Sequence, residues 1–206
     1  GGGAFAPPST LSIDTLLRIP QKPWALIQHV AEPTVRWFAH EEHRPGQREM
    51  LKDGLTTLQE GRNLIACAPT GVGKTAAALS ASIDTARRRE KQTTVLFLTG
   101  RQSQHRIAVE TVRKLNQRRP EGEPPLRLSD LLGQQAMCVR SIRKEPSFLF
   151  SRLCAEERQQ RRCAPYLERD EAFTRSIAQG LLHADEAVKR AVELHTPICA
   201  WRVARE

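Results

Sequence analysis

The segment ACAPTGVGKTAAALS, residues 66–80, constrains the fold of this chain more than any other stretch of its sequence. A glycine-rich loop separates a short apolar run, residues 63–67, from residues 75–90, which begin with helix-forming alanines. Gly71 and Gly73 let the backbone turn its N–H groups toward phosphate oxygens, and a helix that starts at the loop adds the positive end of its dipole. The order of strand, loop and helix therefore predicts a phosphate-binding site.

The side chains of this loop indicate that the phosphate belongs to a nucleotide. Lys74 can reach the β- and γ-phosphates, and Thr75 offers a hydroxyl to Mg²⁺. A simple glycine turn between a strand and a helix does not explain this lysine–threonine pair. We therefore predict ATP and Mg²⁺ as cofactors, with Lys74 and Thr75 as catalytic residues. The other predicted ATP-binding residues of the loop are Ala68, Pro69, Thr70, Gly71, Val72 and Gly73.

The tetrapeptide RPGQ, Arg44 to Gln47, lies about thirty residues before the phosphate loop. A glutamine amide donates and accepts hydrogen bonds at once, so it can read the edge of an adenine base. The alternative interpretation is a proline turn that starts a helix. The position relative to the loop favours a role for Arg44 and Gln47 in ATP binding.

The pattern around the loop predicts an α/β fold. Residues 63–67 and 93–99 are candidate buried strands, and residues 75–90 and 102–117 are candidate helices. A strand, helix, strand, helix order at these lengths indicates a parallel sheet with a right-handed crossover. After about residue 138 the strand signals disappear, and residues 171–195 have mostly helical spacing.

Composition narrows the class of partner. The 206-residue chain has a net charge of +9, which favours a polyanionic partner such as nucleic acid. No apolar run is long enough for a transmembrane helix, and the N-terminal residues do not resemble a signal peptide. We therefore expect no membrane partner, a cytoplasmic location (nuclear in a eukaryote), and cysteines present as reduced thiols.

Four of the five cysteines follow the phosphate-loop part of the chain, whereas Cys67 precedes the loop directly and is predicted to be a small core residue. The four are separated by 15, 8 and 35 residues, which are not the close pairs of a zinc ribbon. Four thiolates are the number that a [4Fe–4S] cluster requires. Unrelated buried cysteines, or a zinc site in which His195 replaces one cysteine, are the alternatives. The four are Cys138, Cys154, Cys163 and Cys199.

The segments RPGQ, APTGVGKT, VLFLTGRQSQ, MCVR, RLC, RRCAPY and PICAW occur in this order. In this arrangement the chain resembles the XPD/DinG-like iron–sulfur DNA helicases of superfamily 2. The resemblance implies a partial RecA-like P-loop domain that is interrupted by a small, mostly helical iron–sulfur domain with the four cysteines as ligands. The implied boundaries are an N-terminal extension at 1–37, the first part of the ATP-binding domain at 38–137, the iron–sulfur domain at 138–199, and the return to the ATP-binding domain at 200–206.

The resemblance also implies contacts with DNA. Thr99, Arg101 and Gln104 look like the helicase motif that contacts the backbone of single-stranded DNA. Basic residues near the first three cysteines can follow a phosphate backbone, or simply solvate short helices. They are Arg140, Arg143, Lys144, Arg152, Arg161 and Arg162. The implied function is an ATP-dependent DNA helicase with 5′ to 3′ polarity, connected with DNA repair and acting on single-stranded or forked DNA.

The segment HADEAV, residues 183–188, resembles an acidic Walker B box, but its spacing is helical and it precedes Cys199. We predict that Asp185 and Glu186 lie on a helix instead. Because the sequence stops seven residues after Cys199, we expect the N-terminal part of a larger helicase that is inactive by itself. The competing hypothesis is a nucleotide-gated, nucleic-acid-binding module with a structural zinc site and no motor activity.

Overall fold

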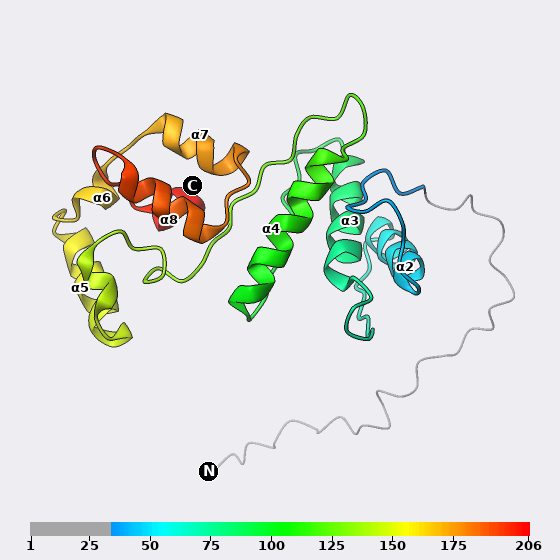
Figure 1. Ribbon diagram of the computed structural model, residues 1–206, viewed down its shortest axis with the longest axis horizontal. Coiled ribbons are helices and arrows are strands. Elements are labelled where there is room, and N and C mark those ends of the chain that lie inside the picture. Colours follow the sequence, from blue (N-terminus) through cyan, green and yellow to red (C-terminus); the bar gives the residue numbers. More distant parts are fainter. Residues whose placement is uncertain (1–33) are drawn as a thin grey trace, which may run out of the picture. The chain divides into compact units, whose positions relative to one another are not determined.

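The computed structural model describes residues 34–206, and its regular elements are helices joined by turns and extended segments (Figure 1). No helix in this range is long and apolar enough to cross a membrane. The elements are α2 (Gln47–Gln59), α3 (Lys74–Arg87), α4 (Gln102–Gln117), the 3-10 helix η1 (Ser141–Lys144), α5 (Ser147–Gln159), α6 (Ala164–Leu167), α7 (Glu171–Gln179), α8 (Ala184–Glu193) and α9 (Ala200–Arg205).

The predicted α/β fold with a parallel sheet is wrong, because residues 34–206 contain no strand. Residues 63–67 and 93–99 are extended, but no backbone hydrogen bond in the described part of the chain pairs them. Most of their apolar side chains face solvent: Ile65 is 99% exposed and Leu98 is 88% exposed, whereas Val95 packs against the cluster between α3 and α4. Apolar, β-branched composition indicates only that a segment suits a sheet, whereas a strand exists through hydrogen bonds to a neighbour. The part of the chain that the structure describes therefore lacks the partial RecA-like sheet that the resemblance implies.

Helix α3 carries the phosphate loop at its start and packs against α2 on one face. A Cβ atom on Gly54 of α2 would lie 3.1 Å from the Cβ of Ala81 on α3, so the two helices approach closely at small residues. Leu51 and Leu55 of α2 are fully buried beside Ala77 and Ala81. The helix pair thereby fixes the direction in which the loop leaves α3.

The opposite face of α3 packs against α4 through a second apolar cluster. Leu79 and Ile83 of α3 meet Val112 and Leu115 of α4 there, and Trp37 fills the same cluster with no exposed surface. The spacing of these residues, three and four apart, is that of amphipathic helices. The prediction of helices at 75–90 and 102–117 is confirmed.

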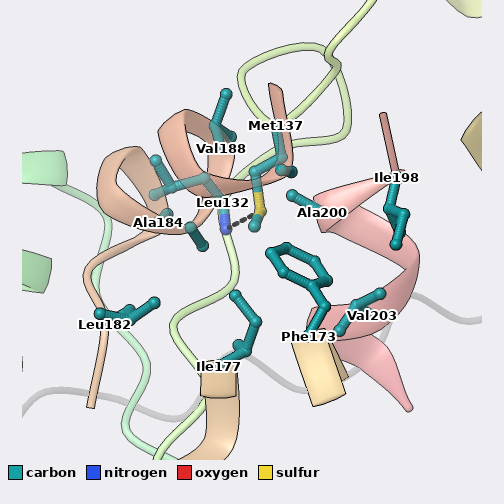
Figure 2. Packing of buried hydrophobic residues seen from close by; sticks show 12 residues of the cluster. Leu132, Met137, Phe173, Ile177, Leu182, Ala184, Val188, Ile198, Ala200 and Val203 are labelled. Atoms are coloured by element: carbon teal, nitrogen blue, oxygen red, sulfur yellow. Dashed lines mark hydrogen bonds between the residues drawn. The ribbon is translucent and has the colours of Figure 1, made fainter. Parts of the chain in front are cut away.

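A third cluster forms the core of the segment that contains the last four cysteines (Figure 2). Phe173 and Ile177 of α7 pack here with Ile198 and with Met137, whose sulfur accepts a hydrogen bond of 3.2 Å from the backbone N–H of Leu132. Short helices with single apolar faces share this core. The prediction of a mostly helical segment at 171–195 is also confirmed.

The HADEAV segment starts α8, as its helical spacing predicted. His183 is the N-cap: its ring nitrogen Nδ1 accepts from the N–H of Asp185, and the Glu186 carboxylate accepts from the N–H of His183 at 2.8 Å. This reciprocal arrangement is a capping box. Glu186 also pairs with Arg113 of α4, so it is a structural carboxylate rather than a magnesium ligand on a strand.

Asp130 connects α4 with the start of α8. Its carboxylate accepts a hydrogen bond from the backbone N–H of Ala184 at 2.9 Å and contacts Nδ1 of His105 at 2.7 Å. The side chain of Arg113 adds a bond to the carbonyl of Leu181. Because Asp130 is only 8% exposed, loss of its carboxylate would leave the N–H of Ala184 buried without an acceptor.

We expect the substitution Asp130→Ala to lower the free energy of unfolding by about 1–3 kcal/mol, because it leaves a buried N–H without an acceptor. The matched control is Asp53→Ala on the exposed face of α2, which should change stability by less than about 0.5 kcal/mol. Urea unfolding followed by circular dichroism measures both. Equal effects of the two substitutions would contradict the role of Asp130 as a connector.

Candidate functional site

The phosphate loop runs directly into the first residue of α3. Gly71 and Gly73 both have the left-handed backbone conformation, with φ of 94° and 90°. Helix α3 begins at Lys74, so its unpaired N–H groups and the positive end of its dipole lie at the loop. The structure thus has the loop-to-helix order that the sequence predicted, although the strand before the loop is missing.

The two loop glycines are needed for different reasons. A Cβ atom on Gly73 would lie only 2.2 Å from Nε2 of Gln47, so this position requires glycine for space as well as for its backbone conformation. A Cβ atom on Gly71 would meet nothing within 4 Å, so only the conformation matters there. The side chain of Gln47, which lies outside the loop, therefore restricts position 73 to glycine.

That contact comes from the RPGQ tetrapeptide. The Gln47 side chain donates from Nε2 to the carbonyl of Gly73 at 3.1 Å, and its Oε1 accepts from the N–H of Arg44 at 3.1 Å. The Arg44 guanidinium donates to the carbonyl of Gly71. Gln47 is 1% exposed, and both ends of its amide are hydrogen-bonded to backbone groups. Each end of the Gln47 amide makes one of its two possible hydrogen bonds, so one N–H donor and one lone pair are left for an adenine base.

Lys74 spans the loop that precedes it. Its ammonium group donates to the carbonyls of Ala68 at 2.9 Å and Pro69 at 2.8 Å. A phosphate oxygen that enters the loop can replace these carbonyls as the acceptor. Thr75 is half-buried in the first turn of α3, next to Lys74, where its hydroxyl lies at the same end of the helix. Thr70 is exposed and Val72 is half-buried.

The predicted contacts to single-stranded DNA gather at the start of α4. The hydroxyl of Thr99 donates to the side-chain oxygen of Gln104, and the N–H of Arg101 donates to the same hydroxyl at 3.4 Å. The side chains of Arg101 and Gln104 are exposed. These residues therefore form one exposed polar turn at the start of α4.

The last four cysteines line a single cavity. Cys138 precedes η1, Cys154 lies on α5, and Cys163 and Cys199 are the N-caps of α6 and α9. Burial raises the pKa of the Cys138, Cys154 and Cys199 thiols. Cys67 is exposed beside the phosphate loop, so the prediction that it is a core residue is wrong.

The four cysteines that line this cavity are its possible metal ligands. Within residues 34–206, no three His, Cys, Asp or Glu side chains converge closely enough to hold one metal ion. A zinc ion would require every thiolate about 2.3 Å from its centre. His195 is exposed and does not line the cavity.

The family model for DEAD/DEAH box helicases matches residues 44–147, just over half of the chain. The chain belongs to the DEAD/DEAH box helicase family. The match begins at Arg44 and includes the phosphate loop and the start of α4. Family membership implies an ATP-dependent helicase that binds nucleic acid, with ATP and Mg²⁺ as typical cofactors. Searches of curated proteins and of solved structures found no match.

The basic residues near the cavity of this helicase fall into two groups. Arg140 pairs with Glu157 at 2.8 Å and holds the pKa of that carboxyl below its usual value, and Arg162 also pairs with Glu157. The ion pairs with Glu157 thus partly neutralise the charges of Arg140 and Arg162. The other group is exposed, and its side chains have no hydrogen bond or ion pair within the described part of the chain. It consists of Arg143, Lys144, Arg152 and Arg161.

Sequence reasoning missed Gln134, which lines the cysteine cavity. Its Nε2 atom is buried and has no hydrogen-bond partner among the described residues. A buried N–H donor without a partner costs free energy, so Gln134 is the polar side chain of this cavity whose burial the described residues do not offset. No spacing or composition signal distinguishes Gln134 from Gln135, whose amide is bonded to the carbonyls of Arg143 and Glu145.

The two loop glycines offer a matched test of the RPGQ contact. We expect Gly73→Ala to lower the free energy of unfolding by about 2–5 kcal/mol, because the left-handed conformation disfavours a Cβ and the displaced Gln47 loses a buried bond. Gly71→Ala should cost only the conformational part, about 1–2 kcal/mol. Chemical unfolding of both variants without nucleotide gives the comparison. Equal losses of stability in the two variants would show that the Gln47 side chain can move away from position 73 without a cost in free energy.

Proposed function

We propose that this protein is an ATP-dependent DNA helicase of the iron–sulfur type, with 5′ to 3′ polarity, acting on single-stranded or forked DNA. The observation that supports ATP binding is the phosphate loop. Arg44 and Gln47 donate hydrogen bonds to its glycine carbonyls, and the ammonium group of Lys74 donates to the carbonyls of Ala68 and Pro69 at its start. DNA as the substrate and the polarity rest on the resemblance to the XPD/DinG-like helicases.

In this proposal the chain binds ATP by exchanging acceptors at the loop. Lys74 leaves the carbonyls of Ala68 and Pro69 and donates to the β- and γ-phosphates. Thr75 offers its hydroxyl to the accompanying Mg²⁺. Gln47 links the loop to α2, so a base bound by the Gln47 amide contacts the side chain that holds Gly73. Nucleotide binding and the packing of α2 on α3 are coupled through this amide.

The proposed cofactor of the cysteine cavity is a [4Fe–4S] cluster. The donor set fits, because four thiols from separate parts of the chain line one cavity. Bound there, the cluster would cross-link the segment before η1 with α5 and with the starts of α6 and α9. Cys138, Cys154, Cys163 and Cys199 would hold it through their thiolates, and Arg140, which lines the same cavity, pairs with Glu157.

The competing proposal is a nucleotide-gated, nucleic-acid-binding module with a structural zinc site. The residues that line the cysteine cavity do not distinguish a zinc ion from an iron–sulfur cluster. Membership of a helicase family supports motor activity. The metal content of the purified protein separates the two proposals.

We expect Lys74→Ala to weaken ATP binding by about 10- to 150-fold, because a hydrogen bond to a charged group contributes about 1.5–3 kcal/mol. Titration with a fluorescent ATP analogue measures the affinity. The control is Lys91→Ala, an exposed lysine beyond α3 that should leave the affinity unchanged. An unchanged affinity in the Lys74 variant would overturn the assignment of the loop.

We expect about four irons and four acid-labile sulfides per chain after anaerobic purification. Cys154→Ser should lower both contents, because it removes a buried ligand from the cavity, whereas Cys67→Ser should leave them unchanged. Elemental analysis with a sulfide assay measures them. One zinc and no sulfide would refute the cluster and support the alternative module, and the nucleotide site would stand.

A further inference from the structure

The corner formed by η1 and the start of α5 carries basic side chains that form no hydrogen bond or ion pair with the described residues. Arg143 and Lys144 end η1, and Arg152 lies one turn into α5. All three side chains are exposed and have no partner among residues 34–206, in contrast to Arg140 and Arg162. Glu145 follows Lys144 and offsets part of this charge. The corner keeps a net positive charge that is open to a polyanion.

An aromatic side chain lies in the middle of these cations. Phe148 is the second residue of α5 and is 79% exposed, more than any other large apolar side chain in the described residues outside the two extended segments. Arg152 is four residues later on the same helix, so the two side chains are neighbours on one face. Because η1 contacts α5, Arg143 and Lys144 lie at the same end of the helix.

Single exposed apolar residues are common on protein surfaces and need no explanation. A nearly fully exposed phenyl ring among unpaired cations is a more specific combination. Sequence-tolerant binding of single strands uses this pair of features, with cations for the phosphates and aromatic rings on which bases stack. A paired duplex would engage only the cations, since its bases are already stacked on each other.

We propose that Phe148 is a base-stacking residue and that, together with Arg143, Lys144 and Arg152, it forms a binding surface for single-stranded nucleic acid. This inference rests on the proposed function, from which it takes the class of substrate, and it adds the side chain that contacts the bases. Phe148 contributes affinity that does not depend on salt, whereas the three cations contribute the part that does.

The test is the affinity of the full chain for a fluorescein-labelled oligo(dT), measured by anisotropy over a range of salt concentrations. We expect Phe148→Ala to weaken binding by about 5- to 150-fold without changing the slope of log K against log salt. Phe148→Tyr keeps a ring and should retain most of the affinity. Arg152→Gln should weaken binding and lower the magnitude of that slope by about 0.7.

A control and a second readout separate stacking from structural damage. Val192→Ala, an exposed apolar residue of α8, should leave binding unchanged. An oligonucleotide that contains 2-aminopurine should lose fluorescence on binding to the unmodified chain, because stacking quenches this base, and should lose less with Phe148→Ala. Circular dichroism should show the same helix content in every variant, since Phe148 supports no core.

The outcomes distinguish this inference from the proposed function. If the unmodified chain binds no single-stranded DNA or RNA, both fail. If it binds and Phe148→Ala binds equally well, only the stacking role is overturned, and the ring is left as a contact for a protein partner. Equal losses in Phe148→Ala and Phe148→Tyr would also overturn stacking, because tyrosine keeps the π-face.

Discussion

The buried amide of Gln47 is the interaction on which the nucleotide part of this structure depends. It joins the turn before α2 to the carbonyl of Gly73, directly before α3. The close approach of α2 and α3 at Gly54 and Ala81 places the amide there, and glycine at position 73 leaves room for it. Because Gln47 is buried, an unmet bond would cost about 1–3 kcal/mol, which keeps the loop in one shape.

Helix α4 extends this framework toward the cysteine segment. It packs on α3 through Leu115 and Val112, and it begins at the exposed turn that includes Arg101. In the second half of α4, the Arg113 side chain donates to the carbonyl of Leu181. Near the start of α4, His105 contacts the Asp130 carboxylate, which also accepts a hydrogen bond from the N–H of Ala184 in α8. Helix α4 thus contacts both α3, which follows the phosphate loop, and the segment that contains the last four cysteines.

The helices were predictable because each carries its own signal. Apolar residues three and four apart mark α3 and α4, and the Asp–Glu pair after His183 marks the capped start of α8. The sheet was predicted wrongly because a strand has no such local signal. Residues 63–67 and 93–99 have the composition of buried strands, yet they lie mostly exposed and unpaired in residues 34–206. Pairing depends on a neighbour, which composition does not reveal.

The sequence by itself determined the phosphate loop, its lysine and threonine, and the family to which the chain belongs, because these depend on residue types at fixed short spacing. Only the tertiary structure decided what surrounds them. It brought Gln47 to Gly73, gathered four cysteines from distant positions around one cavity beside Gln134, and left Phe148 exposed among free cations. These contacts join residues far apart in the chain, and packing of whole helices, rather than local spacing, selects them.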